Sequence, residues 1–252
     1  MIGAQALSLA YGQTRVVEDV DFSLQPGCLT ALIGANGCGK STLMRGLAGL
    51  HAAQQGQALG PAQEPIAVRR KTLAYLPQSL PEPSALSVEG FALLGADSPT
   101  AWSASTAAKQ RVASALEQLD LRALATRACA TLSGGEYRRA GLAACLAQGT
   151  PWLLLDEPCA GLDLPHAAAL MSGLKRWLAK DEKRGALVIL HDLNLAAQWA
   201  DRLLLMANGR LVADDTAEAV LTSPQLETAF GGQLQRFRHP EGNHLVVLGP
   251  SP

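Results

Sequence analysis

The chain has 252 residues, enough for one large α/β domain or for one domain with a modest insertion. Hydrophobic residues make up 48% and charged residues 17%, so most of the chain is expected to fold. Lys and Arg number 21 against 22 Asp and Glu, and aromatic residues are only 4%, which argues against a nucleic-acid partner.

The five cysteines are odd in number and scattered, and no pair has the spacing of metal ligands. We therefore expect reduced thiols, as in a cytoplasmic protein. No stretch of about 18 apolar residues is present, and the N-terminus lacks a charged segment followed by an apolar run. The sequence thus predicts neither a membrane-spanning helix nor a signal peptide.

The first predicted elements are antiparallel strands within residues 5–23, which alternate apolar and polar positions around a turn at residues 12–13. An apolar run at Leu29–Ile33 predicts a buried strand. A glycine-rich loop at residues 34–39 and helical spacing over residues 41–50 follow. Strand, loop and helix in this order form half of a βαβ unit.

Three further apolar runs predict buried strands at residues 72–76, Trp152–Leu155 and residues 186–190. Polar side chains follow these runs: Gln78, the pair Asp156 and Glu157, and His191. Open α/β sheets bind ligands at the carboxyl ends of their strands. The residues that follow all four predicted strands are therefore expected to share one site.

The rest of the chain is predicted to be mainly helical. Residues 86–131 are rich in Ala and place Val112, Leu116 and Leu119 at helical spacing, which indicates an inserted helical subdomain. A further helical region at residues 216–230 is broken at Pro224, and His244–Leu248 is β-like. We expect one domain, 1–252: a core of 1–84 and 131–230, a helical insertion of 85–130 and a β-like tail of 231–252.

Residues 34–41 fit the P-loop pattern, with Gly34, Ala35, Asn36, Gly37, Cys38, Gly39, Lys40 and Ser41 in order, and Thr42 follows. Glycines let backbone N–H groups turn toward phosphate oxygens, and the following helix directs its positive end to the same place. Lys40 would supply a charge for the β- and γ-phosphates, and the Ser41 hydroxyl would bind Mg²⁺. A chance glycine turn is the alternative. The expected cofactors are ATP and Mg²⁺.

Two acidic residues end the strand Trp152–Leu155. Asp156 would hold Mg²⁺, and Glu157 is placed to polarise an attacking water. Acidic residues often end strands, so this pattern gains its meaning from the P-loop.

The P-loop also has a cysteine, Cys38. The nearby Lys40 and helix start predict a lowered thiol pKa and ready alkylation in the absence of nucleotide.

Leu132 to Glu136 read Leu-Ser-Gly-Gly-Glu, and Ser133 and Glu136 fit a capping box before a helix over residues 137–148. The bare N–H groups of Gly134 and Gly135 and the Ser133 hydroxyl would also form a second phosphate-binding surface. One chain cannot easily apply both surfaces to one γ-phosphate, whereas a symmetric dimer can.

These motifs, with residues 160–163 (Ala-Gly-Leu-Asp) and His191, occur in the order and spacing of the ATP-binding cassette (ABC) ATPases, which the chain resembles. The resemblance implies a P-loop NTPase core with an antiparallel β subdomain and a helical signature subdomain, in a head-to-tail homodimer around two ATP. By analogy, Tyr11 stacks on adenine, Gln78 senses the γ-phosphate and Mg²⁺, and His191 contacts the γ-phosphate. Glu157 is the implied base, and Asp163 communicates across the dimer.

The implied residue sets are larger than these examples. The implied catalytic residues are Glu157, His191, Gln78 and Lys40. The implied Mg²⁺ ligands are Ser41, Gln78 and Asp156. The residues implied to bind the partner's ATP are Ser133, Gly134, Gly135 and Glu136.

A finer resemblance, to the ATPase subunits of importers for ferric siderophores, heme and vitamin B12, comes from residues 191–197, 200–202, 208–210 and 219–222 and from Glu136. Departures are Ala160 and Gly161 before Leu-Asp, and residues 96–99 after Leu94 and Gly95. The finer resemblance implies import of an iron chelate, with a ferric siderophore preferred over heme or cobalamin as the cargo. The implied partners are membrane permease subunits and, indirectly, a periplasmic binding protein, with this subunit peripheral on the cytoplasmic face of the inner membrane. The alternative is a soluble ABC ATPase of DNA repair or translation.

Overall fold

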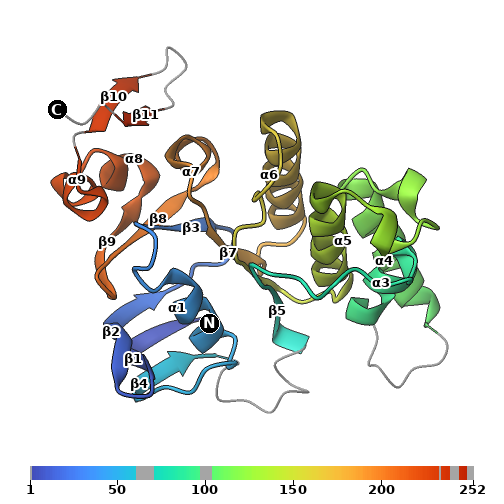
Figure 1. Cartoon of the computed structure of the whole chain (residues 1–252), viewed down its shortest axis with the longest axis horizontal. Coiled ribbons are helices and arrows are strands. Elements are labelled where there is room, and N and C mark those ends of the chain that lie inside the picture. The colour runs from blue at the N-terminus through green and yellow to red at the C-terminus, as the bar shows by residue number, and fades with distance from the viewer. Residues whose placement is uncertain (1, 61–70, 97–103, 233, 239–243, 249–252) are drawn as a thin grey trace.

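The computed structural model describes residues 2–60, 71–96, 104–232, 234–238 and 244–248 (Figure 1). Its centre is a sheet of six strands in the order β5-β6-β7-β3-β8-β9. Their bounds are β3 (Leu29–Ile33), β5 (Leu73–Leu76), β6 (Trp152–Leu155), β7 (Gly185–Ile189), β8 (Arg202–Ala207) and β9 (Arg210–Thr216). All neighbours are parallel except β8 and β9.

The parallel strands are buried on both faces, and the register keeps their carboxyl ends level. Leu76 of β5 pairs with Leu155 of β6, which pairs with Val188 of β7. Successive residues of β3 enter opposite cores: Ile33 packs on the side of the larger helices, and Leu32 on the side of α1 (Lys40–Leu47). Apolar runs without alternation are what a parallel sheet covered on both faces requires.

A second sheet of three antiparallel strands, β2-β1-β4, packs beside α1. Its strands are β1 (Gly3–Tyr11), β2 (Thr14–Ser23) and β4 (Gln55–Leu59). The predicted hairpin is confirmed, since Tyr11 pairs with Thr14 across residues 12–13. Strand β4 was not predicted, because it is partly exposed and its sequence carries no apolar run. Helix α1 ends at Leu47 rather than at residue 50. A tight turn follows Leu47, in which Gly49 N–H donates to Gly46 O.

The predicted helical insertion is confirmed. It contains α3 (Val88–Ala96) and α4 (Thr106–Gln118), which pack against α5 (Gly134–Ala147) to one side of the central sheet (Figure 1). Val112, Leu116 and Leu119 are all buried, as their spacing predicts. Helices α6 (Leu164–Ala179) and α7 (Leu193–Trp199) belong to the same core.

The C-terminal part contains α8 (Ala217–Leu221), α9 (Pro224–Phe230) and the strands β10 (Leu234–Arg238) and β11 (His244–Leu248). The predicted break at Pro224 is confirmed, because that proline starts α9. The antiparallel pair β10 and β11 confirms the β-like character of His244–Leu248.

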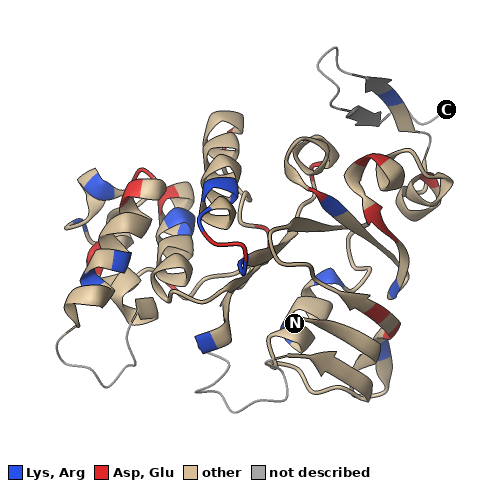
Figure 2. Ribbon diagram, turned by 180° about the vertical axis from the view of Figure 1, so that it is seen from behind, with Lys and Arg blue, Asp and Glu red and all other residues tan. Residues whose placement is uncertain are grey.

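Strands β8 and β9 were not assigned from the sequence. Basic and acidic residues are interspersed over the described elements (Figure 2).

Gly95→Ala is expected to lower the free energy of unfolding by about 1–3 kcal/mol, because overpacking strains a close helix contact. A Cβ at Gly95 would lie 2.0 Å from the backbone oxygen of Ala144 on α5, which cannot move without shifting the helix. Gly90→Ala on the same helix is the control, since its Cβ would meet only the Ser87 Oγ, at 3.1 Å. Gly90→Ala should be neutral or stabilising by about 0.5–1 kcal/mol. Equal urea-unfolding midpoints for the two variants would contradict the prediction.

Candidate active site

The P-loop connects β3 to α1 and forms one wall of a cavity of about 560 Å³. Gly34 and Gly39 have positive φ values of 149° and 107°, and a Cβ on either would strike a backbone oxygen, of Met206 or Val16. The Lys40 ammonium donates to the carbonyls of Gly34 and Ala35, at 2.8 and 2.9 Å. The cavity is lined by Val16, Asn36, Gly37, Gly39, Lys40, Ser41, Thr42, Gln78, Glu157 and His191.

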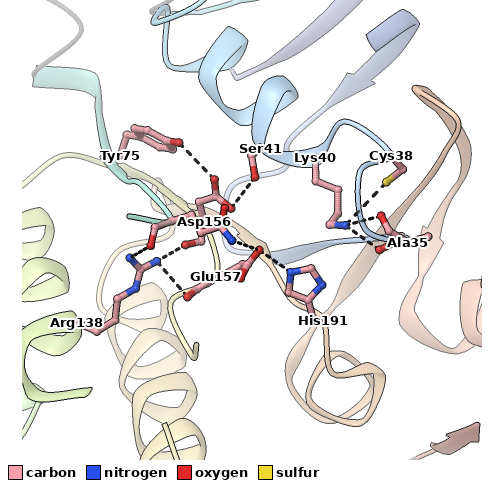
Figure 3. Close-up of polar contacts among 11 residues, drawn as sticks. Ala35, Cys38, Lys40, Ser41, Tyr75, Arg138, Asp156, Glu157 and His191 are labelled. Carbon is pink, nitrogen blue, oxygen red and sulfur yellow. Dashed lines mark hydrogen bonds and ion pairs between the residues drawn. The ribbon is translucent and has the colours of Figure 1, made fainter. Parts of the chain in front are cut away.

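Asp156 is fully buried at the end of β6. Ser41 Oγ donates to its Oδ1 at 3.2 Å, and the Tyr75 hydroxyl approaches its Oδ2 at 3.5 Å (Figure 3). Burial raises the pKa of the Asp156 carboxyl, against the lowering effect of the Ser41 hydrogen bond. Burial, helped by the Asp156 charge, raises the pKa of Tyr75 to about 12, so the phenol keeps its proton.

The oxygens of Ser41 and Asp156 fit Mg²⁺. The described residues contain no group of three or more His, Cys, Asp or Glu side chains that could hold a metal ion. Mg²⁺ rarely needs such a cage, because it keeps several waters and is usually bound by one or two carboxylates together with substrate phosphates. A buried carboxylate beside a hydroxyl at a P-loop is therefore a suitable partial ligand set.

The backbone at Glu157 is strained. Its φ of 53° is left-handed, a conformation that is uncommon outside glycine and costs about 1–3 kcal/mol. Gln78 Nε2 donates to its Oε1 at 3.0 Å, and His191 Nε2 lies 2.5 Å from the same oxygen (Figure 3). The three residues follow β5, β6 and β7, so the predicted convergence of Gln78, Glu157 and His191 at one sheet edge is confirmed.

Arg138, on α5, is a residue of this region that the sequence analysis missed. Its Nη1 donates to the carbonyls of Pro77 and Gln78, at 2.6 and 2.7 Å. Its Nη2 donates to the carbonyls of Asp156 and Glu157, the latter at 3.1 Å. The side chain is 6% exposed, and burial lowers the pKa of Arg138. An Arg at the fifth position of a capped helix was the available signal, but no local pattern shows that it is buried or names its partners.

The predicted capping box is present at the start of α5. Glu136 N–H donates to Ser133 Oγ at 3.3 Å, and Ser133 N–H donates to Glu136 Oε2 at 2.7 Å. The hydrogen bonds from Ser133 lower the pKa of Glu136. Space beside Gly134 is open, as a phosphate-binding surface requires. Neither the Ser133–Glu136 segment nor Asp163 lines the P-loop cavity; Asp163 instead caps α6 by accepting from His166 N–H at 3.1 Å, which lowers the pKa of Asp163.

Tyr11, at the end of β1, is 47% exposed and does not line the P-loop cavity either. Its ring centroid is 4.5 Å from that of His51, with the rings tilted by 54°. The exposed ring could accept a stacked base.

The prediction of an accessible, acidified Cys38 thiol is wrong. Cys38 is only 8% exposed, and burial raises its pKa more than the Lys40 charge lowers it. The thiol packs inward, with Sγ 3.9 Å from Lys40 Nζ. Sequence proximity to a cation and a helix start did not reveal which way this side chain points.

Fold and site together define a P-loop NTPase. The ABC transporter family profile matches residues 17–160. The chain is 37% identical over 261 aligned residues to the hemin import ATP-binding protein HmuV of Bordetella pertussis, covering 97% of this chain and 98% of that protein. It is 35% identical to the "Probable siderophore transport system ATP-binding protein YusV" of Bacillus subtilis, covering 95% of this chain and 89% of that protein.

A solved metal-chelate type ABC transporter in an inward-facing conformation superposes with a TM-score of 0.82 and 26% identity, covering 100% of this chain and 97% of that chain. The chain belongs to the ABC transporter family, as an ATP-binding subunit with ATPase activity. Within the described residues, the structure has no helix long and apolar enough to cross a membrane.

Asp156→Asn is expected to stabilise the nucleotide-free protein relative to wild type, and to do so more at about pH 7 than at about pH 4, near the unfolded pKa of the carboxyl. The folded-state pKa of Asp156 is raised, so its favourable contribution is complete below the unfolded pKa of about 3.9 and is lost as the pH rises through the folded value. Asparagine stays neutral throughout. Urea unfolding of both proteins at the two pH values measures the difference, and a pH-independent difference would refute this.

Thiol labelling of the native, nucleotide-free protein should modify Cys28 first, because Cys28 is partly exposed whereas Cys38 is buried. Cys145 and Cys159 should also be slow, because burial raises the pKa of each to about 12. Peptide mapping after brief iodoacetamide treatment gives the order, and denatured protein, in which all five thiols react, is the control. Labelling of Cys38 as fast as of Cys28 would restore the sequence-based hypothesis.

Proposed function

We propose that this chain is the ATP-hydrolysing subunit of an importer of iron chelates, with hemin the first cargo to test and ferric siderophores the second. The observation that supports it is end-to-end similarity: 37% identity to a hemin import subunit over almost the whole of both chains. The structural likeness to a metal-chelate type transporter extends over the full chain as well. A DNA-repair or translation ATPase is not favoured by these relatives.

In the proposed hydrolysis, Glu157 is the general base. Its carboxylate would take a proton from the water that attacks the γ-phosphate. Gln78 and His191, which contact Oε1 of Glu157, would turn to the γ-phosphate when ATP binds. The Lys40 ammonium would exchange the carbonyls of Gly34 and Ala35 for phosphate oxygens.

Ser41, Asp156 and Gln78 are the proposed protein ligands of Mg²⁺. When bound, the ion would neutralise charge on the β- and γ-phosphates. The buried Asp156 gains from such a partner, because its charge is otherwise desolvated. Tyr11 is proposed to stack on adenine.

We propose a head-to-tail homodimer in which Ser133 to Glu136 of each chain bind the ATP held by the other chain's P-loop, with Asp163 at the interface. The outward-open start of α5 supports this. Permease subunits are proposed to dock on residues 78–94, where Leu86 and Leu94 are 44% and 56% exposed. The subunit would then sit peripherally on the cytoplasmic face of the membrane, and cargo from a periplasmic binding protein would never touch it.

Growth on a single iron source tests the cargo. A strain that lacks this gene should lose growth on hemin as the only iron source and keep growth on excess unchelated ferrous iron. Complementation with the wild-type gene should restore it. Loss of growth only on a ferric siderophore would select the second cargo, and normal growth on every chelate would reject import of iron chelates.

Glu157→Gln is expected to lower ATP turnover at least about 100-fold while ATP binding persists, because only the base is removed. With ATP and Mg²⁺, a closed dimer should accumulate on size-exclusion chromatography. The matched control is Glu117→Gln, an exposed carboxylate on α4 that pairs with Arg122 and lies outside the P-loop cavity; this variant should turn over normally. Turnover of Glu157→Gln within about twofold of wild type would remove Glu157 from the role of base.

A further inference from the structure

Helix α5 places a buried side chain, Arg138, between the two loops that carry the proposed catalytic groups. The segment of residues 77–81 after β5 is here the Gln78 loop, and the segment of residues 156–160 after β6 is the Glu157 loop. The Arg138 guanidinium donates to two backbone carbonyls of each loop (Figure 3). The four acceptors are the carbonyl oxygens of Pro77, Gln78, Asp156 and Glu157. Because its donors form a rigid planar fork, one guanidinium fixes the spacing of the two loops.

The neighbours of Arg138 on α5 hold the Gln78 loop as well. The Tyr137 hydroxyl donates to the carbonyl oxygen of Pro81 at 2.9 Å. A Cβ at Gly141 would lie only 2.7 Å from Leu80 Cδ1, so Leu80 packs directly on the α5 backbone. The position of the Gln78 loop is therefore set by α5 at several points along the loop.

The Glu157 loop depends on Arg138 at its most strained residue. Glu157 has a left-handed backbone with φ of 53°, and such a conformation persists only where its surroundings hold it. Its carbonyl oxygen accepts from Arg138 Nη2 at 3.1 Å and from Ala160 N–H at 3.1 Å. Loss of Arg138 would remove the one of these two donors that comes from outside the loop.

We propose that Arg138 is a positioning residue for ATP hydrolysis, which holds the backbone of Glu157 so that its carboxylate meets the attacking water. The inference rests on the proposed function, in which Glu157 is the base. Arg138 would touch neither nucleotide nor water, because it is 6% exposed and does not line the P-loop cavity. A misplacement of a reacting group by about 1 Å can cost about 100-fold in rate.

The role has a kinetic signature. Arg138 donates to the backbone oxygen of Asp156 rather than to its carboxylate, and the P-loop follows a different strand, β3. Removal of Arg138 should therefore lower kcat and leave ATP binding almost unchanged. An arginine that only stabilised the fold would change neither kinetic constant in protein that remains folded.

The test measures kcat and KM for Mg²⁺–ATP, below the unfolding temperature of each variant. Arg138→Met keeps the apolar stem and removes every donor. It should lower kcat by about 10- to 100-fold and change KM by less than about threefold. Arg138→Lys keeps the charge, but its donors share one nitrogen and cannot span both loops, so it should lose only about three- to tenfold in kcat. The lysine variant also keeps the test valid where Arg138→Met fails to fold.

The matched control is Arg111→Met. Arg111, on α4, also donates to two backbone carbonyls, Ala147 O at 2.8 Å and Ala96 O at 3.0 Å, but it lies outside the P-loop cavity. Its replacement should lower the urea-unfolding midpoint and leave kcat within about twofold of wild type. An equal fall of kcat in the Arg111 and Arg138 variants would assign Arg138 a structural role alone and overturn the inference.

A double-mutant cycle tests whether Arg138 acts through the base. In the Glu157→Gln background, Arg138→Met should lower the single-turnover rate far less than in the wild-type background, because the carboxylate that it positions is gone. An equal loss in both backgrounds, or wild-type kcat in Arg138→Met, would overturn the inference and leave the proposed function intact. Normal turnover of Glu157→Gln itself would instead count against the proposed function.

Discussion

Parallel pairing of β5, β6, β7 and β3 is the constraint on which the site depends. Each of these strands is buried on both faces, so its position is set by the two cores and by its neighbours' hydrogen bonds. Level carboxyl ends deliver the P-loop, Gln78, Glu157 and His191 to one edge, although up to 157 positions separate the first from the last in the sequence, counted from Gly34 to His191. A ligand site at such an edge follows from the topology.

Arg138 makes that edge continuous with the helical part of the molecule. One buried guanidinium gathers four carbonyls, from the segments that follow β5 and β6. Helix α5 begins at the capping box of Ser133 and carries Arg138. A displacement of α5 must therefore move Gln78 and Glu157 or break the hydrogen bonds of Arg138. The helix that would bind a partner's nucleotide is therefore mechanically tied to its own chain's proposed base.

Charged groups of the site have polar partners within the protein itself. Lys40 is held by two P-loop carbonyls, and Glu157 by Gln78 and His191. The left-handed backbone of Glu157 adds strain at the same point. A triphosphate would supply alternative acceptors for Lys40, His191 and Gln78, so these three donors would keep partners, and the Glu157 carboxylate would be released to hold the attacking water.

The sequence by itself determined the local elements and the motif residues: the P-loop, the strand ends at Asp156 and His191, and the capping box are periodicity and spacing within a few residues. Strands β4 and β9 were not predicted, because edge strands with polar or mixed faces lack a distinctive period. Strand β8 is an interior strand whose buried apolar run was not assigned from the sequence. Only the tertiary structure decided the direction of the Cys38 thiol, the carbonyl partners of Arg138 and the contact of Arg45 with the Tyr11 hydroxyl. Those are contacts between elements far apart in sequence, and their geometry is set by packing, which no local pattern encodes.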